Sequence, residues 1–170
     1  DLSENSILHA KQFENENLNF EVWDMRDPID HTYDAIFNLF TSFGYFEDDR
    51  DDIKVLRNIK KGLNKNGLFV FDFLNATKLE ATLVKEETKI VEEITFNIRR
   101  EIKNGFILKH ITFTEANTTH SYTERVKYLD LSKMTSYLNK VGFQLVAIFG
   151  DYNLTTFEKN TSDRLILVAK

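Results

Sequence analysis

Apolar residues in the first half of the chain gather in short runs, and helical patterns separate these runs. The predicted strands cover 18–23, 33–40 and 68–73. The last two strands are almost continuously apolar, which is typical of strands covered on both faces. Ser3 can cap a helix over 4–14, and the acidic residues at 48–52 suit the start of another helix. Strands that alternate with helices in this way indicate a mostly parallel α/β sheet.

The pattern changes after residue 80. Polar and apolar residues alternate along 94–128, and Asn104-Gly105 is a strong signal for a hairpin turn. This alternation predicts an antiparallel meander of three half-buried strands. A helix and two strands are predicted after it, at 131–141, 143–149 and 164–169. The chain therefore inserts an antiparallel unit and then returns to its first pattern.

Composition limits the classes of function. The 170 residues are 42 % hydrophobic, which suffices for one packed domain. The formal net charge of −5 argues against a bulk nucleic-acid partner, and no apolar run has the ~20 residues that span a bilayer. The chain has no cysteine, which excludes disulfides and thiolate sites and fits a cytoplasmic location. Its histidines include no closely spaced pair, so no metal site is predicted.

Four stretches and the tail of the chain carry a resemblance to a known family. They are DLSENSI (1–7), EVWDMRD (21–27), YDAIFNLFTSFGYF (33–46), IKKGLNKNGLFVFDF (59–73), and the tail YLNKVGFQLVAIFGDY with DRLILVAK (137–152 and 163–170). Their order and spacing resemble those of class I S-adenosylmethionine-dependent methyltransferases, of the small-molecule type with an antiparallel insert after the fifth strand. No single stretch is specific, but the likeness runs through nearly the whole chain.

The resemblance implies a Rossmann-like, mostly parallel α/β sheet with an antiparallel closing strand. Residues 1–80 and 129–170 would form this core, and 81–128 would form an antiparallel β insert. The family's first strand and glycine-rich loop, which approaches the methionine part of the cofactor, have no counterpart in this chain. We therefore expect residues upstream of Asp1 in the natural protein, weak cofactor binding by the chain as given, and an apolar slot in the sheet where the central strand is missing.

The resemblance also implies five cofactor contacts. Asp1 would accept hydrogen bonds from both ribose hydroxyls, and Leu2 would pack on the adenine face. Asp24 would accept from the exocyclic amine of adenine, with the Met25 backbone beside the ring. Phe40 would lie near the sulfonium group, because such a cation is attracted to aromatic faces. The alternatives are a plain loop acid for Asp1, a turn cap for Asp24, and core residues for Leu2 and Phe40.

The implied substrate contacts come from the loop after the fourth strand and from the meander. They are Thr41, Ser42, Tyr45 and Tyr122. The meander would close over the substrate pocket as a lid. An acceptor that loses a proton needs a base, and either His120 or Tyr122 could serve. The pattern does not choose between them, so no catalytic residue is assigned.

The resemblance implies that the intact protein transfers a methyl group from S-adenosylmethionine to a small-molecule acceptor. The alternative is a non-catalytic binding or assembly module that keeps the sheet without a working cofactor loop. An NAD-dependent oxidoreductase would share the ribose-binding acid, but the order of the closing strands and the inserted meander disfavour it. A small molecule is the expected partner, no membrane contact is expected, and a homodimer is left open.

Overall fold

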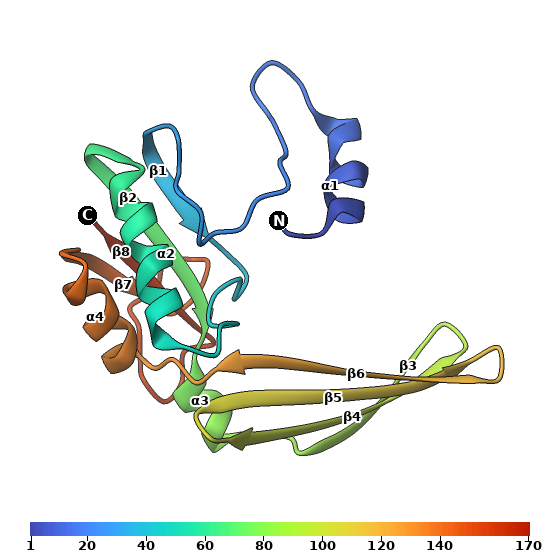
Figure 1. Cartoon of the computed structure of the whole chain (residues 1–170). Coiled ribbons are helices and arrows are strands. Elements are labelled where there is room, and N and C mark those ends of the chain that lie inside the picture. The colour runs from blue at the N-terminus through green and yellow to red at the C-terminus, as the bar shows by residue number, and fades with distance from the viewer.

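The longest strand of the main sheet, β2 (Leu63–Leu74), lies at its centre in this computed structural model, which describes all 170 residues. β2 pairs in parallel with β1 (Tyr33–Asn38) and antiparallel with β8 (Arg164–Ala169). β8 also pairs antiparallel with β7 (Leu145–Phe149), so the strand order is β1-β2-β8-β7 (Figure 1). This mixed sheet confirms the predicted α/β fold with an antiparallel closing strand.

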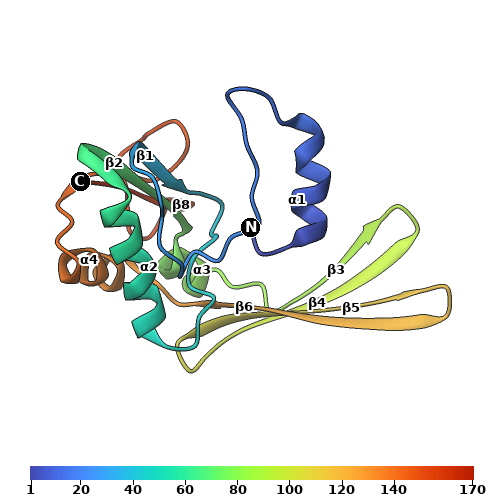
Figure 2. The ribbon, with the colours of Figure 1, turned by 45° about the horizontal axis from the view of Figure 1, so that its top comes forward.

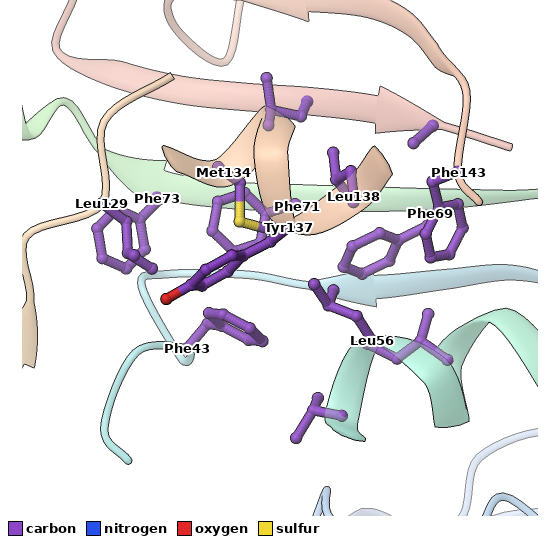
Figure 3. Packing of buried hydrophobic residues seen from close by; sticks show 14 of the residues in the cluster. Phe43, Leu56, Phe69, Phe71, Phe73, Leu129, Met134, Tyr137, Leu138 and Phe143 are labelled. Carbon is purple, nitrogen blue, oxygen red and sulfur yellow. The ribbon is translucent and has the colours of Figure 1, made fainter. Parts of the chain in front are cut away.

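Two helices, α2 (Asp49–Lys61) and α4 (Leu131–Lys140), pack on one face of the main sheet (Figure 3). Alternate residues of a strand point to the same face, so Phe69, Phe71 and Phe73 of β2 all face these helices. All three are fully buried, and the rings of Phe71 and Phe73 stack with their centroids 5.5 Å apart. This aromatic core holds the strand ends at fixed positions.

A short helix, α3 (Ala76–Ala81), links the main sheet to a second one. Its capping residue, Asn75, is buried and donates its side-chain amide to the carbonyl oxygens of Lys159 and Ser162 at 2.9 and 2.8 Å. These bonds fix the loop between β7 and β8 to the end of β2. The boundaries of a separate insert at 81–128 stay a prediction.

Four antiparallel strands form the second sheet, which projects away from the main one (Figures 1 and 2). They are β3 (Glu86–Val91), β4 (Ile94–Lys103), β5 (Phe106–Glu115) and β6 (Thr118–Lys127), in that spatial order. The prediction of three strands is wrong because β3 was missed. Five of its six residues are exposed at the sheet edge, so it lacks the alternation of a half-buried strand. The predicted turn is confirmed, with positive φ at Asn104 and Gly105.

The N-terminal segment contains α1 (Glu4–Ala10) and the 3-10 helix η1 (Lys11–Phe13). Ser3 caps α1 as predicted, with its hydroxyl accepting from Ser6 N at 3.1 Å. The prediction of a strand over 18–23 is wrong, because the segment has no neighbouring strand with which to form a ladder. Instead, Trp23 N donates to the carbonyl oxygen of Asp1 at 3.0 Å, which joins this segment to the start of the chain. None of the helices has the length and apolar composition needed to cross a membrane.

The outer edge of β1 has no partner strand. The prediction that both faces of this strand are covered is also wrong, because Tyr33 is 47 % exposed and Phe37 is 60 % exposed. These two side chains lie on the same face of β1, because they are four residues apart along the strand. The apolar pattern of β1 is that of a strand inside a larger sheet.

Candidate functional site

The candidate site lies at the end of the main sheet where strands β1, β2 and β7 end and β8 begins. The parallel pairing of β1 and β2 brings their carboxyl ends, Asn38 and Leu74, to the same edge (Figure 1). The pairing of β8 places Arg164 opposite Leu74. In open α/β sheets, ligands bind at the carboxyl ends of the strands. The loop after β1 is therefore the first place to look for ligand contacts.

That loop begins with a strained turn. Phe40 and Thr41 have φ values of 57° and 63°, which only glycine adopts without a steric penalty. Asp72 holds both residues: Phe40 N donates to its Oδ2 at 2.7 Å, and Thr41 N donates to its carbonyl oxygen at 3.1 Å. Hydrogen bonds to a buried carboxylate are strong enough to offset strain of this kind. The turn is thus fixed in one conformation.

Phe40→Gly is expected to raise the free energy of unfolding by about 1 kcal/mol, because glycine removes the steric penalty of the left-handed backbone. The ring is 75 % exposed, so its loss sacrifices little burial. Urea denaturation measures the change. Phe37→Gly is the matched control, since Phe37 is also exposed but lies in a regular strand, and it should lose stability. Equal losses in both variants would show that the turn is not strained.

The carboxylate of Asp72 is the centre of a polar network. It is 1 % exposed, and Arg164 Nε donates to its Oδ1 at 2.8 Å. The hydroxyl of Tyr152, in the loop after β7, donates to its Oδ2 at 3.1 Å, and partial desolvation followed by this bond raises the pKa of Tyr152. Thr41 Oγ1 accepts from Leu74 N at 3.1 Å and from Arg164 Nη2 at 3.3 Å. The network ties the ends of β1, β2 and β7 to the start of β8.

Sequence reasoning missed this network. The only signal was Asp72 itself, a single charge in the apolar run Leu68–Leu74. Its partners Tyr152 and Arg164 lie 80 and 92 residues further along the chain. A lone carboxylate inside a buried strand needs a partner, so the residue could have been flagged even though its partners could not.

The residues predicted to hold the adenosine part of a cofactor lie at the N-terminal segment. Asp1 Oδ1 accepts from Ser3 N at 2.7 Å, and no bond is formed by its Oδ2. Leu2 is 65 % exposed. The hydrogen bond from Trp23 N to the Asp1 backbone brings the first residue close to Asp24. The two acids therefore come from neighbouring segments, as the predicted ribose and adenine contacts require.

Asp24 already has a partner within its own turn. Its carboxylate accepts from Arg26 N at 2.9 Å, from Nε at 3.0 Å and from Nη2 at 2.6 Å. These bonds, those of the guanidinium first, hold the pKa of Asp24 at about 2. An adenine amine would have to share this carboxylate with Arg26, so the role of Asp24 stays a prediction. The Met25 side chain packs against the core, and the predicted contact of its backbone also stays a prediction.

The predicted substrate residues fall into two groups. The hydroxyls of Thr41 and Ser42 are used within the turn, where Ser42 Oγ donates to the carbonyl oxygen of Leu39. Tyr45 and Tyr122 are 57 % and 56 % exposed. Partial burial and then the charge of Glu124, two residues after Tyr122 on the same face of β6, raise the pKa of Tyr45. Tyr45 and Tyr122 thus remain available to a ligand on one side of the second sheet.

Tyr122 belongs to a group of aromatic side chains that we call the aromatic ladder. Its members are Phe96, Phe113, His120 and Tyr122. Phe113 lies 4.8 Å from Phe96 and 4.9 Å from His120, measured between ring centroids. His120 lies seven residues, or about 24 Å along the strand, from Lys127, where β6 meets the core. The choice of a general base stays open.

A cavity of about 540 Å³ lies at the opposite edge of the main sheet. Polar residues around Asn64, Gly142 and Gln144 line it, and none of the predicted site residues does. This is the amino-terminal end of β2, not the edge at which α/β sheets bind their ligands. The cavity therefore does not change the location of the candidate site.

No protein-family model and no curated protein sequence matches the chain. Solved structures do match. An S-adenosylmethionine-dependent methyltransferase from Clostridium acetobutylicum ATCC 824 is 19 % identical with a TM-score of 0.84, over 100 % of this chain and 72 % of that one. The CcbJ methyltransferase from Streptomyces caelestis is 16 % identical with a TM-score of 0.82, over 100 % of this chain and 77 % of that one.

A third match is the sugar N-methyltransferase KedS8 from Streptoalloteichus sp ATCC 53650. It is 14 % identical with a TM-score of 0.72, over 99 % of this chain and 68 % of that one. Identities this low establish a common fold and leave the activity open. The chain therefore has the fold of the class I S-adenosylmethionine-dependent methyltransferases.

Proposed function

We propose that the protein transfers a methyl group from S-adenosylmethionine to a small-molecule acceptor. The observation that carries this proposal is the hydrogen bond that joins Asp1 to the segment of Asp24, together with the exposed aromatic residue, Phe40, that Asp72 fixes after the carboxyl end of β1. The resemblance assigns each of these side chains a part of the cofactor, and the proposal keeps those assignments. Two of the matching structures are described as a sugar N-methyltransferase and an amino pentose methyltransferase, so amino sugars belong among the acceptors to test.

The residues present fit such a cofactor. Asp1 keeps one carboxylate oxygen free for ribose hydroxyls, and Leu2 is exposed beside it. Phe40 presents an aromatic ring that would attract a sulfonium group. When bound, S-adenosylmethionine supplies an activated methyl group, so the protein need not form a covalent intermediate. The chain's own residues would bind and orient the two reactants, and alignment of this kind provides a large part of the barrier reduction.

Asp1→Ala in the natural full-length protein is expected to weaken S-adenosylmethionine binding by about 1 to 3 kcal/mol, because the ribose hydroxyls of the bound cofactor would be left without an acceptor. Isothermal titration calorimetry measures the affinity. Glu21→Ala is the matched control, since this exposed acid lies nearby and its side chain makes no hydrogen bond or ion pair. An affinity that Asp1→Ala leaves unchanged would refute the ribose contact.

The second candidate function is a non-catalytic binding or assembly module, and the uncovered edge of β1 favours it. A methyl-transfer assay of the natural full-length protein with pooled small metabolites, amino sugars included, separates the two functions. Transfer of labelled methyl groups supports the enzyme. Absence of methyl transfer, together with absence of cofactor binding by calorimetry, would favour the binding module.

We further propose a cytoplasmic homodimer. The absence of cysteine suits a reducing compartment, and the exposed edge strand β3 suits contact with a second copy. Sedimentation velocity should give the mass of two chains, and a monomer at every concentration would contradict the dimer. A bulk nucleic-acid partner is not proposed, because the net charge is −5.

A further inference from the structure

We propose that Phe40 and Tyr152 form an aromatic corner that binds an organic cation at the carboxyl edge of the main sheet. The inference rests on the proposed function and adds Tyr152, which comes from the loop after β7, to the ligand site. The cation would be the sulfonium of the cofactor or the ammonium group of an acceptor. Aromatic faces attract both kinds of cation.

The geometry of the two rings matches this role. Their centroids are 6.4 Å apart and their planes meet at 66°, so they form two sides of a corner. Phe40 is 75 % exposed and Tyr152 is 60 % exposed. The guanidinium of Arg164 lies 5.8 Å from the centroid of the Tyr152 ring and covers one side of it. The rest of the corner is open to a ligand.

One oxygen atom sets the position of both aromatic residues. Asp72 Oδ2 accepts from the backbone N of Phe40 at 2.7 Å and from the hydroxyl of Tyr152 at 3.1 Å. The carboxylate is buried and its other oxygen is bound to Arg164, so it cannot move independently. A hydroxyl that donates to an anion also makes its own ring richer in electrons, which strengthens attraction to a cation. The two rings are therefore held together before any ligand arrives.

The loop that carries Tyr152 is built rigidly. Asp151 Oδ1 accepts from Asn153 N at 2.9 Å and from Thr155 N at 3.1 Å, and Gly150 N donates to the carbonyl oxygen of Thr155 at 2.8 Å. A side chain at Gly150 has no space, because its Cβ would lie 2.2 Å from Ser162 Oγ. The loop thus presents Tyr152 from a fixed backbone.

Stability alone does not explain this arrangement. Phe40 occupies a strained conformation, yet most of its ring remains in water. The backbone bond to Asp72 offsets the strain, but the aromatic ring itself buries little surface and so adds little stability. Strain of this kind accumulates at ligand sites, where the backbone must hold a side chain toward the ligand.

The test compares the affinities of the natural full-length protein for S-adenosylmethionine and S-adenosylhomocysteine by calorimetry. The two ligands share the adenosine part, but only the first is a sulfonium cation. Tyr152→Leu and Phe40→Leu should each lower the preference for the cation by about two- to fivefold, the range of exposed cation–π contacts. Tyr152→Phe keeps the ring and should restore most of the preference. General damage to the site would weaken both ligands equally and leave their ratio unchanged.

A second arm identifies the source of the cation. Tetramethylammonium is titrated into the protein saturated with S-adenosylhomocysteine, and binding is followed by NMR. Loss of this binding in Tyr152→Leu, with an unchanged ratio in the first arm, assigns the corner to an acceptor ammonium group. An unchanged ratio together with unchanged tetramethylammonium binding overturns the inference and leaves the proposed function intact. Failure of the unaltered protein to bind either adenosyl ligand overturns both.

Discussion

Lys127→Met is expected to lower the free energy of unfolding by about 3 to 5 kcal/mol near neutral pH, the usual effect of removing one partner of a buried ion pair. Lys127 is 5 % exposed at the end of β6. Its Nζ donates to Asp49 Oδ1 at 2.9 Å and to Asp52 Oδ2 at the start of α2. Asp52 is fully buried and its Oδ1 has no partner, so methionine would leave an unpaired carboxylate inside the protein.

The loss should shrink as the pH falls. Burial raises the pKa of Asp52 from 3.8 to about 6 even with Lys127 beside it. Since Lys127 lowers that pKa, its removal raises the value further. Between the unfolded and folded pKa values the folded state holds a proton that the unfolded state releases, so stability falls as the pH rises through this window. Urea denaturation of the variant at about pH 8 and about pH 5 should show recovery of stability at the lower pH.

Two further variants control this prediction. Lys133→Met breaks the ion pair of Lys133 with Asp49, whose side chains are 46 % and 47 % exposed, and should cost no more than about 1 kcal/mol. Asp52→Leu added to Lys127→Met removes the unpaired charge and should restore most of the stability. A loss that is small and independent of pH would show that Asp52 is not held as a buried charge.

Asp72→Ala is expected to lower the free energy of unfolding by about 3 kcal/mol, because it leaves Arg164 unpaired and removes the hydrogen-bond acceptor that fixes the turn. Arg164 is 21 % exposed, so water can only partly replace the lost carboxylate. The backbone N of Phe40 would also lose its acceptor. The affinity of the natural protein for S-adenosylmethionine should fall along with stability, because Phe40 and Thr41 would no longer be fixed.

The matched control is Asp163→Ala. Asp163 precedes β8 and pairs with Lys78 at 2.6 Å, but its side chain is 80 % exposed. Its removal should change stability by no more than about 1 kcal/mol. Urea denaturation and calorimetry measure both properties. Equal effects of the two substitutions would mean that Asp72 does not hold the turn.

The hydrophobic pattern predicted all four strands of the main sheet and three of the four strands of the second sheet. The alternating phenylalanines of β2 are buried, as their pattern indicated. β1 and the segment over 18–23 carry similar apolar patterns, but the first has one exposed edge and the second forms no ladder. An apolar pattern indicates which residues of a strand favour burial, whereas strand pairing depends on which other strands lie beside it. The exposed edge strand β3 lacked the pattern altogether.

The buried ion pair of Asp52 and the polar network of the candidate site were only partly predictable for a different reason. The acids at 48–52 suggested a solvated helix start, because charge at a helix N-terminus has a local explanation. Only the fold shows that Asp52 points inward to Lys127, 75 residues further along the chain. The network of Asp72 likewise depends on Tyr152 and Arg164. Local patterns therefore located the strand ends, but contacts between distant residues decide which side chains are fixed there.

We propose above that S-adenosylmethionine binds at the carboxyl ends of the strands of the main sheet. A calorimetric titration of the cofactor into the natural full-length protein, and into its Asp1→Ala and Glu21→Ala variants, tests it most directly. We expect saturable binding at one site per chain, which Asp1→Ala weakens and Glu21→Ala leaves unchanged. Absence of binding by the unaltered protein, or equal affinities in all three proteins, would contradict it.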